Sequence, residues 1–251
     1  MTAKCTPPEL CAYLVTLLSH THGERPLRPL LPPVPANMVS ADRRALLFLV
    51  LYVAMLALCP LLLDEALFMW AFSETGPFER LSVWTWVVTA LVVLWRIRPL
   101  TLRAYAFAAM CLAFAAREAD WHKAFTGDSF LKFNFYRDAA RPLQEKLICG
   151  AIATVLVALV LYVALVFARF LFLRGGWRSR SGGWLLAAGT LLVAGKLLDR
   201  LPAILSGDYG IEFSPLAIQY FSAFEEGTEP INPLIFAASV WISQTGRRYL
   251  S

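Results

Sequence analysis

Six long apolar stretches dominate the pattern of this chain. Polar or proline-containing sequence separates them, and they cover residues 44–63, 81–97, 100–120, 147–169, 184–202 and 221–243. About 20 apolar helical residues are needed to cross a bilayer core roughly 30 Å thick. The pattern therefore predicts an all-α, polytopic membrane protein with about six transmembrane helices.

The first 43 residues have a different character. Thr6-Pro7-Pro8-Glu9 resembles a capping box with proline at the first helical position, which predicts a short helix to about Ser19. The stretch from His22 to Pro35 is rich in proline and is expected to be extended. We therefore expect a cytosolic N-terminal segment over residues 1–43, with a short amphipathic helix, and a six-helix transmembrane domain over residues 44–251.

Composition supports a membrane location and excludes other classes of protein. The chain is 58% hydrophobic and 16% charged, whereas a soluble domain is about 25% charged. The net charge of +5 does not indicate nucleic-acid binding, because the basic residues are spread among the loops instead of forming one stripe. The five cysteines show no spacing typical of zinc sites or disulfide frameworks.

The distribution of charge predicts the orientation in the membrane. The N-terminal segment, every second loop and the C-terminus together hold 14 of the 23 Lys and Arg residues but only three of the 18 acids. Cytoplasmic loops of membrane proteins carry an excess of Lys and Arg. We therefore expect a multi-pass protein of the cell inner membrane with both termini in the cytoplasm.

Ionisable residues gather at the ends of three apolar segments that this topology brings to the outer face. They are Arg117, Glu118 and His122 after the third segment, Lys196, Asp199 and Arg200 in the fifth, and Glu225, Glu226 and Glu229 in the sixth. A charge inside the membrane costs about 2.5–3.5 kcal/mol at a helix centre, so such residues usually mark a functional site. The sequence therefore predicts a polar cavity that opens at the outer face.

The spacing of these residues suggests a metal site as one interpretation. Glu118 and His122 have i, i+4 spacing, as do Glu225 and Glu229, and Asp199 offers a further oxygen. Carboxylates with one imidazole suit a divalent cofactor such as Zn, Mn or Fe. Pro230 and Pro233 predict that the opening turns of the sixth segment are kinked or widened, which would free backbone carbonyls beside these ligands.

Two other interpretations of the cluster stay open. Arg117, Lys196 and Arg200 are cations that can neutralise most of the carboxylates, which would make the cluster an internal salt-bridge network. A single histidine also fits poorly with zinc, which usually takes two or three. The third interpretation is a proton or ion pathway, although the cytoplasmic halves of the segments contain few polar residues.

The longest outer connection, residues 121–145, interleaves aromatic and basic residues. This composition is typical of a segment that lies at the membrane interface, where it contacts lipid headgroups or covers the outer cavity.

The sequence is compatible with three classes of function. The first is an enzyme, with or without a metal, that acts on a lipid or lipid-linked substrate. Its catalytic residues would be Glu118, His122 and Glu226, and Arg117, Lys196 and Arg200 would bind an anionic group of the substrate. The second is an assembly subunit that docks a membrane-protein or extracytoplasmic partner. The third is a small ion- or proton-coupled transporter. No sequence motif of a known hydrolase or phosphate-binding loop favours the enzyme.

Overall fold

A computed structural model describes residues 36–243, with side chains from residue 42 onwards. The short helix and the proline-rich stretch predicted for residues 1–35 lie outside the described residues. The chain divides into two units, residues 1–49 and 50–251. The second unit contains all the helix contacts that position the candidate site.

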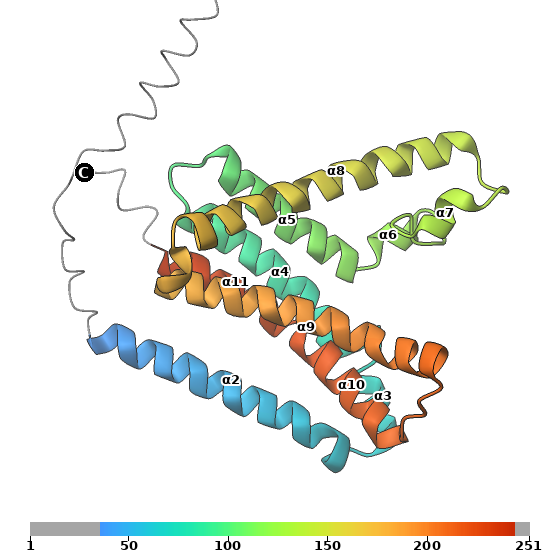
Figure 1. Cartoon of the computed structure of the whole chain (residues 1–251), viewed down its shortest axis with the longest axis horizontal. Coiled ribbons are helices and arrows are strands. Elements are labelled where there is room, and N and C mark those ends of the chain that lie inside the picture. The colour runs from blue at the N-terminus through green and yellow to red at the C-terminus, as the bar shows by residue number, and fades with distance from the viewer. Residues whose placement is uncertain (1–35, 244–251) are drawn as a thin grey trace, which may run out of the picture. The chain divides into compact units, whose positions relative to one another are not determined.

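The described part of the chain consists of helices and their connections (Figure 1). In chain order the helices are α2 (Ala36–Leu62), α3 (Glu65–Ala71), α4 (Pro77–Arg96), α5 (Leu102–Glu118), α6 (Trp121–Ala124), α7 (Phe133–Arg137), α8 (Leu143–Ala168), the π-helix η1 (Arg169–Leu173), the 3₁₀-helix η2 (Gly176–Arg178), α9 (Arg180–Tyr209), α10 (Pro215–Thr228) and α11 (Ile231–Ile242).

The all-α prediction is confirmed for the described residues, which contain no β-strand. Within residues 36–243, four helical stretches are long and apolar enough to cross a membrane: Asp42–Leu62, Pro77–Arg96, Leu143–Leu173 and Arg180–Tyr209. These correspond to the first, second, fourth and fifth predicted segments.

The third and sixth predicted segments differ from single spanning helices. Helix α5 has only 17 residues and ends at Glu118, because Asp120 adopts a left-handed conformation (φ 55°) that an α-helix does not accommodate. The sixth segment is divided into α10 and α11 at Glu229 and Pro230. The division lies at Pro230, where the sequence predicts a kinked or widened turn within one helix, and it goes further than that prediction.

Two helices extend beyond the apolar stretches that predict them. The stretch able to span a membrane, Asp42–Leu62, agrees with the predicted 44–63, and α2 is already helical at Ala36, the first described residue. Helix α9 begins at Arg180 instead of residue 184, because the Ser179 side chain caps its first turn by accepting a hydrogen bond from the Gly182 N–H. The glycine-rich stretch from 175 to 183 is therefore a short turn followed by the first turn of α9.

Hydroxyl groups connect the central helices. The Thr89 hydroxyl of α4 donates to the Pro233 carbonyl of α11 at 2.9 Å. Ser181 of α9 and Ser239 of α11 each donate to the backbone carbonyl of the other, at 2.9 and 2.8 Å. Small hydroxyl residues allow helix backbones to approach closely and supply hydrogen bonds where water is absent.

The C-terminal half of α2 packs against α10 at a glycine. The Tyr52 hydroxyl donates to the Gly227 carbonyl at 2.6 Å, and Leu56 is fully buried. A Cβ atom on Gly227 would lie only 2.3 Å from a Leu56 methyl carbon. Glycine at this position therefore allows the two helices to touch.

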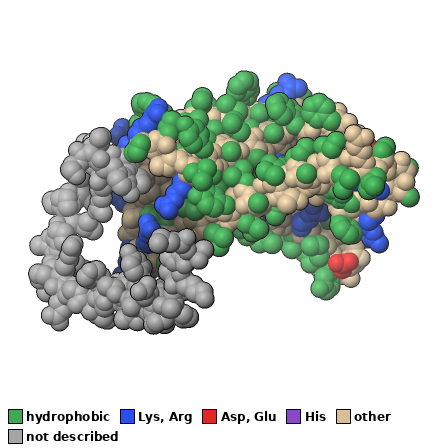
Figure 2. Space-filling model, turned by 90° about the horizontal axis from the view of Figure 1, so that it is seen from above, with side chains coloured by type: hydrophobic (Ala, Val, Ile, Leu, Met, Phe, Trp, Pro, Cys, Tyr) green, Lys and Arg blue, Asp and Glu red, His purple; other side chains and the backbone are tan. Residues whose placement is uncertain are grey.

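Apolar side chains are spread over the face of the molecule shown in Figure 2. On α8, for example, Val155 is 67% exposed and Leu165 is 64% exposed. A soluble protein rarely exposes so much apolar helix surface, whereas a membrane protein presents it to lipid.

Candidate functional site

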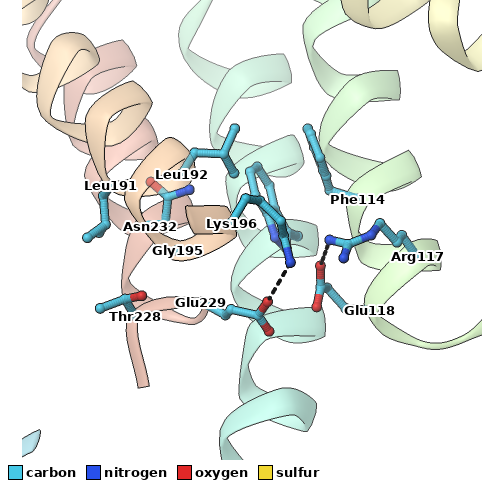
Figure 3. A pocket seen from close by; sticks show the side chains of 11 residues that line it. Phe114, Arg117, Glu118, Leu191, Leu192, Gly195, Lys196, Thr228, Glu229 and Asn232 are labelled. Carbon is cyan, nitrogen blue, oxygen red and sulfur yellow. Dashed lines mark hydrogen bonds and ion pairs between the residues drawn. The ribbon is translucent and has the colours of Figure 1, made fainter. Parts of the chain in front are cut away.

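A small pocket lies where α4, α5, α9 and the α10–α11 junction meet (Figure 3). Its volume of about 30 Å³ is enough for one or two water molecules. The lining residues are Trp86, Phe114, Arg117, Glu118, Leu191, Leu192, Gly195, Lys196, Thr228, Glu229 and Asn232.

Two carboxylates enter this pocket from different helices. Glu118 is the last residue of α5, its side chain is only 8% exposed, and Arg117 donates a hydrogen bond of 2.9 Å to it. Glu229 comes from the α10–α11 junction and interacts electrostatically with Glu118. Figure 3 shows both side chains pointing toward the same space.

Lys196 of α9 lies between these carboxylates and supplies positive charge. Its ammonium nitrogen is 3.6 Å from Glu229 Oε1 and 3.7 Å from Asp199 Oδ2. Both distances exceed those of direct hydrogen bonds, which are about 2.7–3.2 Å. At these distances the contacts are ion pairs and not direct hydrogen bonds.

Asn232, the second residue of α11, contributes an unsatisfied polar group to the pocket. The residue is 6% exposed and lines the pocket. Its side-chain oxygen is buried and has no hydrogen-bond partner among the described residues. Leaving a buried polar group unpaired costs about 1–3 kcal/mol. The amide oxygen is therefore available to a ligand or an ordered water.

Carboxylates outnumber cations around this pocket. Glu226 interacts electrostatically with Glu229, Glu118 and Glu79, although it makes no direct ion pair with any described residue. Glu79, in the first turn of α4, also has a buried carboxylate oxygen without a hydrogen-bond partner among the described residues. Lys196 and Arg117 line the pocket with Glu118 and Glu229, and the excess of carboxyl groups comes from Glu226 and Glu79, which lie outside the lining.

Some predicted site residues lie beside the pocket instead of lining it. Arg200 has a side chain that is 73% exposed, and its Nε atom lies 3.7 Å from Asp199 Oδ2. Glu225 interacts electrostatically with Asp199 and Lys196. These residues extend the charged region outward along α9 and α10.

His122 lies apart from the position that the sequence predicts. We expected it on the same helix face as Glu118, but α5 ends before it and His122 belongs to the short helix α6. Its Nδ1 atom is 3.9 Å from Asp120 Oδ1 and makes no hydrogen bond within the described residues. Burial lowers the pKa of His122 from its ordinary value, and nearby Lys123 acts in the same direction.

The predicted metal ligands do not form one group. Among residues 36–243 no set of three or more His, Cys, Asp or Glu side chains is close enough to hold a metal ion. The i, i+4 pair of Glu118 and His122 is absent because of the turn at Asp120, and Asp199 is engaged by Lys196 and Arg200. The metal-site hypothesis stays a prediction without a preassembled ligand set.

Three residues of this region were missed from the sequence. Glu79 was counted only as one of many acids on the outer side, although its place in the first turn of a spanning helix is a usable signal. Asn232 and Trp86 carry no charge, so a search for ionisable residues passes over them.

No protein-family model matches this chain, and neither a curated protein nor a solved structure matches it. The function must therefore be inferred from the geometry of the site.

Proposed function

We propose that the chain crosses the inner membrane six times, with α5 and the α10–α11 pair as crossings in addition to the four long apolar helices. The charge pattern supports this topology. Arg96, at the end of α4, donates to the Trp241 carbonyl at the end of α11, so both helices end on one side. No acid occurs between residues 81 and 117 or between residues 146 and 198, which include the arginines on that side. By the positive-inside rule that side is cytoplasmic, as are both termini.

Helix geometry then gives the depth of the pocket. Glu118 follows Arg103 by 15 residues and Lys196 follows Arg180 by 16. At 1.5 Å per residue these spacings are about 22 and 24 Å. If the arginines mark the cytoplasmic boundary of a core roughly 30 Å thick, the pocket lies about 6–8 Å below the outer boundary.

The function we propose is the binding of a small cationic ligand, a hydrated proton or an ion the size of ammonium, in this pocket. The observation that carries the proposal is the buried, unpartnered amide oxygen of Asn232 beside an excess of carboxylates. A cation of this kind would offset the negative charge and donate a hydrogen bond to the free amide oxygen of Asn232. The small volume of the pocket favours a small ligand.

A thermal-stability titration tests this function. Purified protein is melted in increasing sodium, ammonium or magnesium chloride, with choline chloride holding the ionic strength constant, and across a pH series. A ligand that binds only the folded state raises the melting temperature with concentration. We expect such a rise in the wild type and its loss in Asn232→Leu, whereas the exposed control Asn134→Leu keeps it. The proposal is wrong if the melting temperature of the wild type does not change with cation concentration or pH and Asn232→Leu melts at a higher temperature. The pocket would then be a packing defect.

The contacts around the pocket favour a binding site over a continuous pathway. Towards the cytoplasmic side, the hydroxyls of Thr89, Ser181 and Ser239 all donate to backbone carbonyls, so these groups connect helices. The enzyme acting on a lipid-linked substrate and the subunit that docks an extracytoplasmic partner stay predictions, because no observation in the described residues favours either.

A further inference from the structure

The connection between α5 and α8 is held together by one arginine. Arg141 forms ion pairs with Asp128 at 2.5 Å, Glu145 at 2.9 Å and Asp138 at 3.5 Å. Its guanidinium also lies 4.4 Å from the centre of the buried Phe135 ring. Ion pairs to Arg141 and the buried ring of Phe135 therefore hold this connection together.

The same pairing leaves two basic residues of the connection without a carboxylate partner, although residues 119–145 hold equal numbers of basic and acidic residues. Arg141 engages three of its acids, and Asp120 pairs with Lys123 at 2.9 Å. Among the described residues Lys132 and Arg137 have no carboxylate partner. They flank apolar side chains, since the Arg137 guanidinium lies 5.6 Å from the centre of the Phe133 ring. Phe133 is 73% exposed and Leu131 is 43% exposed. We name Leu131, Lys132, Phe133 and Arg137 the cationic-aromatic patch.

We propose that the cationic-aromatic patch binds anionic phospholipid headgroups, with Phe133 and Leu131 inserted at the level of the ester groups and Lys132 and Arg137 on the phosphates. Aromatic rings favour the membrane interface, and long basic side chains extend from apolar surroundings to the headgroups. In the sequence, the patch lies in the connection between α5 and α8, two helices of the membrane domain. The ends of these helices therefore hold it near the membrane boundary. This inference is independent of the ligand proposed for the pocket.

The test uses full-length protein with a fluorescent amino acid placed genetically at the exposed position Asn134. The protein is reconstituted in vesicles of phosphatidylcholine containing a fixed fraction of brominated phosphatidylglycerol or brominated phosphatidylcholine. Each surface cation contributes about fivefold to the local enrichment of an anionic lipid. We expect stronger quenching by brominated phosphatidylglycerol in the wild type, loss of that preference in Lys132→Gln/Arg137→Gln, and its retention in the control Arg200→Gln.

Two results would overturn the proposal. Equal quenching by the two brominated lipids in the wild type, with free access of aqueous iodide, would show that the patch faces water. Shielding from iodide in native membranes but not in pure lipid vesicles would show that an acidic protein covers the patch instead of lipid. Because all substituted side chains are exposed, each variant should fold, and circular dichroism provides the check.

Discussion

Among single residues, Lys196 shows how the pocket balances its charges. It is the cation closest to Glu229, and its side chain is 43% exposed. Replacing it with methionine removes positive charge from a region that already has too many carboxylates. A fully buried ion pair broken in this way costs about 3–5 kcal/mol, and exposed pairs cost about 1 kcal/mol or less. We expect Lys196→Met to fall between these limits, at about 1–2 kcal/mol. The measurement is chemical denaturation in detergent. The control is Arg200→Met, because the Arg200 side chain is more exposed, and we expect it to change the free energy of unfolding by less than about 0.5 kcal/mol.

His122 gives a second prediction, concerning pH. Its pKa is lowered in the fold, so the folded protein binds fewer protons there than the unfolded chain. His122 therefore contributes fully to the free energy of unfolding above its ordinary pKa near 6.5. This contribution is lost as the pH falls through the lower pKa that His122 has in the folded protein. The groups acting on it besides burial are Asp120, Lys123, Arg117 and Lys132. Melting temperature should fall less between pH 7.5 and 5 in His122→Gln than in the wild type. If the melting temperatures of the wild type and of His122→Gln fell by the same amount between pH 7.5 and 5, His122 would not be buried in the fold.

Charged residues of the site were the ones that could be predicted from the sequence. Glu118, Lys196 and Glu229 stand out because ionisable groups in apolar segments are costly, and the structure places all three on one pocket. His122 could not be placed correctly, since its position depends on a left-handed turn at Asp120 that helical spacing does not reveal. Asn232 could not be found, because its importance lies in having no partner for its side-chain oxygen within the described fold.

Among the helices, the contact between α2 and α10 is the most sensitive to side-chain volume. Alanine at Gly227 would push its methyl group against Leu56, at 2.3 Å. Overpacking of this kind costs about 1–3 kcal/mol. We expect Gly227→Ala to lower the free energy of unfolding by that amount, or to release α2. The control is Gly189→Ala in α9, where no atom lies within 4 Å and the better helix propensity of alanine should stabilise. Equal effects of the two substitutions would contradict close packing at Gly227.

Helix type was predictable from the sequence, but helix ends were not. Apolar length is enough to identify α4, α8 and α9, and proline chemistry is enough to predict a distortion near Pro230, but not the division into α10 and α11. The start of α9 depends on local capping by the bond from the Gly182 N–H to Ser179, and a sequence offers several equally plausible helix starts.

For the molecule as a whole, topology rests on charge and helix direction. We predict that a cysteine replacing Trp177, which is 49% exposed in η2, is labelled by a membrane-impermeant maleimide only after the membrane is opened. A cysteine replacing Phe125, 89% exposed beside α6, should be labelled in intact cells. The reverse pattern would invert the topology and place the pocket at the cytoplasmic face.

The proposed function requires that the carboxylates gather for a ligand and not for packing, and Glu226→Gln separates these two roles. Glu226 interacts with Glu229, Glu118 and Glu79 and forms no ion pair with a described residue, so it adds repulsion to the pocket when no cation is bound. Glutamine removes the negative charge and keeps the shape. We predict a melting temperature equal to or above that of the wild type without added cation, together with loss of the cation-dependent rise. Two results together would contradict the proposed function: the melting temperature of the wild type does not respond to cations or pH, and Glu226→Gln melts at a lower temperature than the wild type.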